Sequence, residues 1–461
     1  MSWTVPLALY GWIGCVAILF ATLAPARAAL AAYLIGWLLL PVAELELFDV
    51  FDYGKSTAVP GVVFLAVVAF DGARLMRLRL GWLDLPIALV CAAPLCSSLS
   101  NGIGWYDGLS SSTYQVIVWG LPYLTGRLYF STPDGMRLLG MGVLAGGLAY
   151  APLCWWEIRM SPQLHTDVYG FLQHDWTQTL RSGGYRPMVF QHHGLMLGLW
   201  MSAASLVAVA LWTSGTTRRV WGVPHVFVAA LLCATTALCK SFGALALLLI
   251  GAATLWSMRA LRSSLPMLLL ACLPASYVLL RVSGNWSGDA LTSAVAEVSS
   301  ARAHSLAYRF DAEEQLRDKA EQKPLLGWGG WGRSFVRRQA DPDSREMVVT
   351  DSLWILFFGK YGSLGLAAML LTFLVPVLAL WRRHPPRTWW RPQAFWPWVL
   401  ALVLTLYAID NLVNAMLNPI YLLIAGGLCG FASVRVAAVS RARSFGSIPP
   451  PPRLDARVEL R

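Results

Sequence analysis

Residues 188–212 read MVFQHHGLMLGLWMSAASLVAVALW and contain no Lys, Arg, Asp or Glu. A helix of this length can cross the ~30 Å hydrocarbon core of a bilayer. Apolar windows of similar length recur along the chain, with short polar stretches between them. We therefore predict an all-α polytopic membrane protein with about 12–13 transmembrane helices and two extracytoplasmic loops. The predicted spans are residues 5–23, 29–47, 59–73, 82–99, 112–130, 136–155, 188–212, 219–238, 241–257, 264–281, 352–380 (one long or broken helix), 395–415 and 418–434.

The composition favours a membrane protein over a soluble one. Hydrophobic residues make up 57% of the chain and charged residues only 13%, whereas a soluble domain has roughly 25% charged residues. We predict one transmembrane domain over residues 1–440 and a basic, Pro-rich tail at 441–461, which we expect to be disordered. The eight cysteines lie in or beside predicted spans, where they are most simply small apolar fillers.

The distribution of basic residues predicts the orientation of the chain. A net charge of +11 could indicate a nucleic-acid partner, but arginines concentrate in every second gap between spans. This alternation follows the positive-inside rule. It puts the C-terminus in the cytoplasm and the loops 156–187 and 282–351 outside, and it argues against a nucleic-acid partner. The basic gaps contain Arg27; Arg74, Arg77 and Arg79; Arg127 and Arg137; Arg218 and Arg219; Arg259 and Arg262; and Arg382, Arg383, Arg387 and Arg391.

The first outer loop carries candidate functional residues. Polar groups at the outer surface of an apolar bundle indicate function or solvent contact. Glu157 lies near the start of this loop, and Arg181, Arg186, His192 and His193 lie near its end. We predict no metal site, because neighbouring histidines point in different directions and no third ligand follows at a matching spacing. The alternative role for each outer arginine is contact with lipid headgroups.

The second outer loop combines a basic residue, Arg309, with the run Pro324-Leu325-Leu326-Gly327-Trp328-Gly329. Glycines let the backbone approach a ligand, and a tryptophan face suits a sugar ring, although a turn at the membrane surface also explains this run. Asp351 ends the loop where the chain re-enters the bilayer. A carboxylate at that place is either a helix N-cap or a general base.

Taken in order, these residues resemble the motifs of the O-antigen ligase and polymerase superfamily, which includes Wzy-type polymerases and bacterial O-oligosaccharyltransferases. The resemblance covers roughly residues 120–430, and the last motif departs from it, because Asp351 stands where ligases typically carry His. The matching stretches are Arg186 to His193; Cys239-Lys240-Ser241-Phe242-Gly243-Ala244; Arg309 with Pro324-Leu325-Leu326-Gly327-Trp328-Gly329; and Asp351 to Gly365.

The resemblance implies a glycosyltransferase of GT-C-like plan in a bacterial inner membrane, with its active site on the periplasmic side. The donor would be a glycan on a polyprenyl diphosphate, and an acceptor hydroxyl would attack the anomeric carbon with inversion. Arg186 and Arg309 would clamp the diphosphate without a metal cofactor, since guanidinium groups bind phosphate bidentately and stay charged. Asp351 or His193 would take part in catalysis, with His192 and Glu157 as further candidates for the base. The residues expected to bind substrate are Glu157, Arg181, His192, Lys240, Gly327, Trp328 and Gly329.

Three functions stay open at this point. Polymerisation of O-antigen or exopolysaccharide repeat units is favoured, because the ligase-like His is missing. Ligation onto lipid A core or another acceptor is the alternative within the class. A transporter or flippase is the alternative from another class, although mid-span charges are scarce and no repeat is visible. Expected partners are the lipid-linked donor, a glycan or lipid acceptor, membrane lipids, a chain-length regulator and a flippase.

Overall fold

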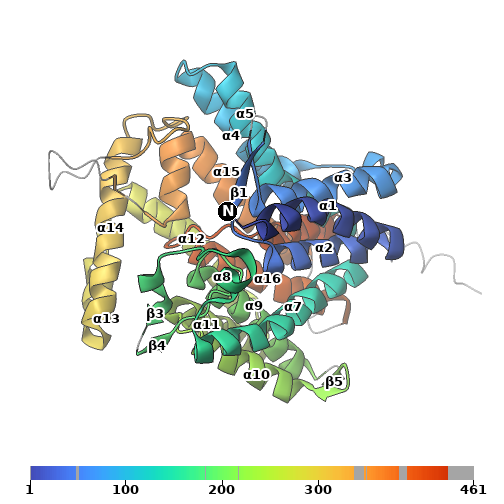
Figure 1. Cartoon of the computed structure of the whole chain (residues 1–461). Coiled ribbons are helices and arrows are strands. Elements are labelled where there is room, and N and C mark those ends of the chain that lie inside the picture. The colour runs from blue at the N-terminus through green and yellow to red at the C-terminus, as the bar shows by residue number, and fades with distance from the viewer. Residues whose placement is uncertain are drawn as a thin grey trace, which may run out of the picture.

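The computed structural model describes residues 2–47, 51–181, 183–215, 218–336, 347–348, 350–383 and 392–433. The predicted tail at 441–461, together with Arg387 and Arg391, lies outside these residues. Helices dominate the described chain, and three short two-stranded hairpins connect some of them (Figure 1).

The elements follow one another in chain order with short connections. The longer helices are α1 (Thr4–Thr22), α2 (Pro25–Leu39), α3 (Lys55–Met76), α4 (Leu85–Ser100), α5 (Trp105–Gln115), α6 (Leu121–Tyr129), α7 (Pro133–Met160), α8 (Leu164–Tyr169), α9 (Gly194–Ser214), α10 (His225–Leu238), α11 (Phe242–Ala260), α12 (Leu265–Val282), α13 (Asp289–Val298), α14 (Ser300–Ala320), α15 (Leu353–Arg383), α16 (Pro392–Asp410) and α17 (Pro419–Ser433). Short helical turns are η1 (Trp82–Asp84), the π-helical η2 (Val116–Gly120) and η3 (Trp176–Thr179). The antiparallel hairpins pair β1 (Glu44–Leu47) with β2 (Phe51–Gly54), β3 (Leu180–Arg181) with β4 (Gly184–Tyr185), and β5 (Arg219–Val220) with β6 (Val223–Pro224).

Every predicted span overlaps at least one helix. Eight helices of the described chain are long and apolar enough to cross a membrane, as a multi-pass membrane protein requires. They are α1, α3, η1 with α4, α7, α9, α11, α12 and α15. The helices α2, α10, α16 and α17 are apolar but shorter. The number of crossings beyond the eight stays a prediction.

Several predicted span boundaries are wrong. The second predicted span ends at Leu39, because Pro41 disfavours a helical residue before it, and a β-hairpin follows. The span predicted at 188–212 begins only at Gly194, and residues 188–193 form a turn outside the helix. The run at 352–380 is broken: within α15, two helical stretches meet at a kink at Gly362, where φ is 63° and ψ is −164°.

The two predicted outer loops contain defined structure. Residues 156–187 continue α7 and then form α8, η3 and the β3–β4 hairpin. Residues 282–351 contain α13 and α14, which form a column at one edge of the molecule (Figure 1). These segments therefore hold side chains in fixed places instead of leaving them on irregular loops.

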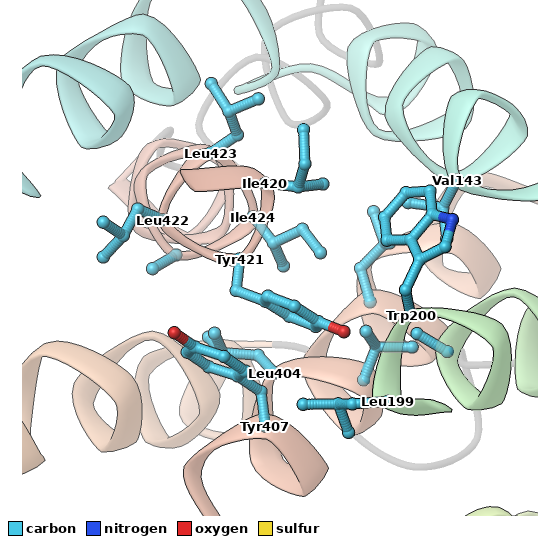
Figure 2. Packing of buried hydrophobic residues seen from close by; sticks show 14 of the residues in the cluster. Val143, Leu199, Trp200, Leu404, Tyr407, Ile420, Tyr421, Leu422, Leu423 and Ile424 are labelled. Atoms are coloured by element: carbon cyan, nitrogen blue, oxygen red, sulfur yellow. The ribbon is translucent and has the colours of Figure 1, made fainter. Parts of the chain in front are cut away.

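The buried hydrophobic core runs through the bundle, and one part of it lies where α7, α9, α16 and α17 meet (Figure 2). The rings of Tyr407 and Tyr421 stack at a centroid distance of 3.9 Å, and Trp200 and Leu199 of α9 pack beside them. Large buried aromatic rings contribute much of a core's packing energy. This core fixes the ends of α9 and α16, from which the candidate site is built.

Arg127, which we assigned to a basic cytoplasmic gap, is buried in the structure. Its Nε lies 2.7 Å from Asp84 Oδ1 and its Nη2 donates to Asp84 Oδ2 at 3.1 Å. Tyr123 donates its hydroxyl to the same carboxylate at 2.7 Å. Such a bidentate, fully hydrogen-bonded pair satisfies both charges away from water. Arg127 therefore joins α6 to η1 and is no evidence for the orientation of the chain.

Candidate functional site

A cavity of about 530 Å³ brings together six of the predicted site residues. Its walls come from the segment before α9, the α10–α11 turn, α14, Asp351 just before α15, and the α16–α17 turn. The predicted residues that line it are Arg181, Arg186, His193, Lys240, Arg309 and Asp351. Polar residues that we did not single out as site residues are His174, Gln178, Ser241, Ser305, Asp410 and Asn414.

Arg186 is fixed by the turn that leads into α9. Its backbone N–H donates to Thr179 O at 2.7 Å, and its side chain is 97% buried, with only 3% exposed. The side chain crosses Gly194, where an added Cβ would lie 2.5 Å from Arg186 Nε. The absence of a side chain at Gly194 therefore leaves the room that this guanidinium needs.

Glu157 stabilises the same turn through hydrogen bonds to its backbone. Its carboxylate accepts hydrogen bonds from the backbone N–H groups of Met188 at 2.8 Å, Val189 at 2.7 Å and Leu164 at 3.2 Å. Val189 has a positive φ of 52°, which is rare for a β-branched residue. Charge-assisted hydrogen bonds to the backbone stabilise such a turn. Glu157 is completely buried and does not line the cavity, so the structure gives it a supporting role instead of the predicted substrate contact.

His193 is the N-cap of α9. Its Nδ1 accepts the backbone N–H of Leu195 at 3.0 Å, and its ring packs edge to face on His174 at 4.6 Å. Burial and then the neighbouring Arg186 charge lower the pKa of His193 to about 3. The ring is therefore neutral near pH 7 and carries its proton on Nε2, since Nδ1 accepts a bond. In this tautomer His193 offers a hydrogen-bond donor to the cavity, not a base.

Lys240 enters the cavity from the turn between α10 and α11. It adopts a positive φ of 51°, which ends α10 and starts the turn to α11. Its ammonium lies against Gly184 of β4, where an added Cβ would overlap it. Arg181 of β3 donates from Nη2 to Gln178 Oε1 at 2.8 Å. The β3–β4 hairpin thus supports two cations of the cavity.

Arg309 of α14 reaches the α16–α17 turn. Its Nη1 donates to Val413 O at 3.0 Å and to Asn414 Oδ1 at 3.4 Å, and its Nη2 lies 3.6 Å from Asp351 Oδ2. The Arg309 side chain is 24% exposed and that of Asp351 48% exposed. These contacts fix the guanidinium at the wall of the cavity and leave part of it open.

The turn between α16 and α17 was predicted to belong almost wholly to two spans. In the structure α16 ends at Asp410, and residues 411–418 turn back before α17. Asp410, the last residue of α16, and Asn414 of this turn line the cavity. Their position at the predicted end of an apolar run is a weak signal, and it could have pointed to a polar turn.

Both charged and apolar side chains line the cavity. Four cationic side chains (Arg181, Arg186, Lys240 and Arg309) and two carboxylates (Asp351 and Asp410) line it. Apolar residues complete the wall, among them Phe242, Ala246 and Leu247 of α11, Leu306 of α14 and Met416. Phe242 is 59% exposed. An anionic group joined to an apolar chain matches this combination of cationic and apolar side chains.

The Gly-Trp run does not line the cavity. Trp328 N donates to Gly359 O and Gly329 N to Lys360 O, both at 2.9 Å, at the kink of α15. The Trp328 ring is covered by Lys319, whose Nζ lies 3.8 Å from the ring centroid. Gly327 contacts the same kink through its backbone. The structure thus gives this run a packing role, and substrate contact by Gly327, Trp328 and Gly329 is not supported by its geometry.

His192 is exposed beside the cavity and does not line it. Its ring lies 6.1 Å from that of His174. Among the described residues, no group of three or more His, Cys, Asp or Glu side chains is placed to hold a metal ion.

The sequence was also compared with known proteins. No protein-family model and no curated protein matches this chain.

Proposed function

We propose that this protein transfers a glycan from a polyprenyl-diphosphate-linked donor to an acceptor hydroxyl at the extracytoplasmic face of a bacterial inner membrane. Polymerisation of O-antigen or exopolysaccharide repeat units is the reaction that we favour. One observation carries the proposal: Arg186 and Arg309, far apart in the sequence, line one cavity together with Arg181 and Lys240.

The charge of the cavity suits a diphosphate. A diphosphate ester carries at least two negative charges, and its leaving group gains charge as the glycosidic bond breaks. Fixed guanidinium donors stabilise charge that develops in the transition state, and they need no reorganisation when they are already held in place. The Arg186 side chain is buried and packed against Gly194, and the Arg309 guanidinium is held by Val413 and Asn414. Both are thus preorganised for this role.

The apolar wall suits the lipid. Phe242, Ala246 and Leu247 belong to α11, one of the eight helices that can cross a membrane. A polyprenyl chain can therefore approach along α11 from the bilayer while its diphosphate reaches the cations. A water-soluble nucleotide sugar would gain nothing from such a wall.

Variants of the two arginines test the proposal. Purified protein in detergent is supplied with a lipid-linked oligosaccharide donor and an acceptor, and release of polyprenyl diphosphate is measured. We expect Arg186→Ala and Arg309→Ala each to lower the rate about 100-fold, since one such contact supplies on the order of 3 kcal/mol. Arg159→Ala is the matched control, because Arg159 is exposed and does not line the cavity. Equal rates in all of these variants and the unaltered protein would refute the clamp.

The same assay separates an enzyme from a transporter. A transporter breaks no covalent bond, so no polyprenyl diphosphate would appear in detergent solution. Cells that lack the gene then distinguish the two transferases. Accumulation of lipid-linked single repeat units would indicate a polymerase, and accumulation of long lipid-linked chains would indicate a ligase.

A further inference from the structure

One carboxylate at the cavity has a buried oxygen that receives no hydrogen bond from the described residues. Asp410 is the last residue of α16, is only 6% exposed and lines the cavity. Its Oδ1 accepts a hydrogen bond from Asn414 Nδ2 at 2.8 Å. Its Oδ2 is buried and accepts no hydrogen bond from any residue that the structure describes. A buried carboxylate oxygen without a donor costs free energy, and a group that binds in the cavity and donates a hydrogen bond to Oδ2 would remove that cost.

Of the other candidate bases, His192 does not line the cavity, and the remaining three are already engaged. Asp351 is half-exposed and faces Arg309. Glu157 accepts three backbone N–H groups away from the cavity. His193 uses Nδ1 to accept the N–H of Leu195, so its free nitrogen is a donor. Asp410 is the carboxylate whose free oxygen and burial both fit proton abstraction from a hydroxyl.

We infer that Asp410 is the general base that takes the proton of the acceptor hydroxyl. This inference rests on the proposed glycan transfer. The acceptor O–H gives its proton to Asp410 Oδ2, and the acceptor oxygen forms the new bond to the anomeric carbon. The bond from that carbon to the phosphate oxygen breaks, and its electron pair leaves on the diphosphate, where Arg186 and Arg309 stabilise the charge. Atoms and charge balance, and no further reactant is needed.

Asn414 is the positioning residue in this arrangement. Its Nδ2 orients the Asp410 carboxylate, and its Oδ1 accepts from Arg309 Nη1 at 3.4 Å. One amide thus connects the base to a donor clamp. A base that is oriented by a third group is the general arrangement of activated nucleophiles.

The test uses the full chain in detergent with a defined lipid-linked donor and acceptor. General-base catalysis contributes about 100- to 10,000-fold, so Asp410→Asn should lower kcat by at least about 100-fold. The KM for the donor should change much less, because the arginines remain. Asp410→Gly should lose activity and regain part of it when formate is added, because the small carboxylate can occupy the vacated place and accept the proton. Asn414→Ala should lower kcat less than Asp410→Asn.

Controls separate this role from a structural one. Asp289→Asn, which changes an exposed carboxylate of α13, should keep full activity. Arg309→Ala should not respond to formate. If Asp410→Gly does not fold, the formate experiment is carried out with Asp410→Ser.

Either of two results would overturn the assignment: an Asp410→Asn protein with nearly unchanged kcat, or a folded Asp410→Gly protein that formate does not restore. If unaltered protein forms no product from donor and acceptor, the proposed function itself fails. If it forms product and only Arg186→Ala and Arg309→Ala lose activity, the base assignment alone fails.

Discussion

Single glycines give two of the cations their places. Arg186 crosses Gly194, and the ammonium of Lys240 lies against Gly184. Gly194, the first residue of α9, does not have a positive φ. What matters at this position is therefore the absence of a side chain and not the flexibility of the glycine backbone. The identity of these small residues is as relevant to the cavity as that of the charged ones.

Gly194→Ala should therefore displace Arg186 without unfolding α9. A methyl group there would lie 2.5 Å from Arg186 Nε, and a displacement of about 1 Å at an active site can cost about 100-fold in rate. We expect a rate loss approaching that size in the donor assay, with little change in the thermal unfolding midpoint. Gly14→Ala in α1, where an added Cβ meets nothing within 4 Å, should change neither. Unaltered turnover of Gly194→Ala would show that Arg186 does not need this space.

Two buried histidines predict how stability depends on pH. Burial is the main cause that lowers the pKa of His165 to about 4 and that of His193 to about 3. In the unfolded chain both have pKa values near 6.5. The unfolded state therefore binds more protons below that pH, and the free energy of unfolding falls as the pH drops from about 7 to 5. Asn at both positions removes this titration, and Asn also serves as an N-cap at position 193.

The measurement is the unfolding midpoint in detergent between pH 7.5 and 5. The unfolding midpoint of the double variant His165→Asn/His193→Asn should fall by fewer degrees over this pH range than that of the unaltered protein. Parallel curves for the two proteins would mean that neither ring is held neutral by the fold.

At the scale of elements, the buried ion pair between Glu313 and Arg281 anchors α14, the helix that bears Arg309. Glu313, one turn beyond Arg309, is completely buried; its Oε2 accepts from Arg281 Nε at 3.2 Å and from Tyr277 at 2.9 Å. Its Oε1 accepts from Ser352 and from Trp354 Nε1. A single carboxylate thus ties α14 to α12 and to the start of α15, next to Asp351. Burial raises the pKa of Glu313, while its partners Ser352 and Arg281 oppose that shift.

Glu313→Ala should destabilise the protein strongly. Removal of one partner of a buried ion pair leaves the other charge without compensation and costs about 3–5 kcal/mol. We expect a clear drop in the thermal unfolding midpoint and loss of transfer activity, since Arg309 loses its anchor. Glu321→Ala, at the C-cap of the same helix, removes only a half-exposed pair with Arg317 and should cost less than about 1 kcal/mol. Similar midpoints for the two variants would contradict the anchoring role of Glu313.

The sequence predicts elements better than their ends. Hydropathy finds the long apolar helices, because burial in a bilayer requires long apolar runs. It does not find α8, α13 and α14, which lie in the segments predicted as outer loops. It misplaces the end of α2, where Pro41 and a hairpin intervene, and it misses the polar turn at 411–418. Arg186, Lys240 and Arg309 could be singled out because charges are rare in such a chain. Gln178 and Asn414 could not, because a neutral polar residue near the end of a span has no distinctive pattern.

At the scale of the whole molecule, the cavity is assembled from segments that share one end of the bundle. The residues 174–195, Lys240, Arg309, Asp351 and the turn 410–416 are far apart in sequence. Each falls in or next to a gap that the arginine alternation predicts to lie outside the cytoplasm. At the opposite ends of α9 and α11, Arg259 donates to Thr213 O. This separation of basic connections from the cavity argues for one orientation in the membrane.

Cysteine labelling tests that orientation. Asp289→Cys and Arg219→Cys each introduce one exposed thiol, the first near the cavity end and the second in a predicted cytoplasmic connection. The exposed Cys15, Cys96 and Cys272 are first replaced by Ser. A membrane-impermeant maleimide applied to right-side-out vesicles should label Asp289→Cys at once and Arg219→Cys only after the vesicles are opened. The reverse pattern would place the four cations on the cytoplasmic face, where an extracytoplasmic acceptor could not reach Asp410.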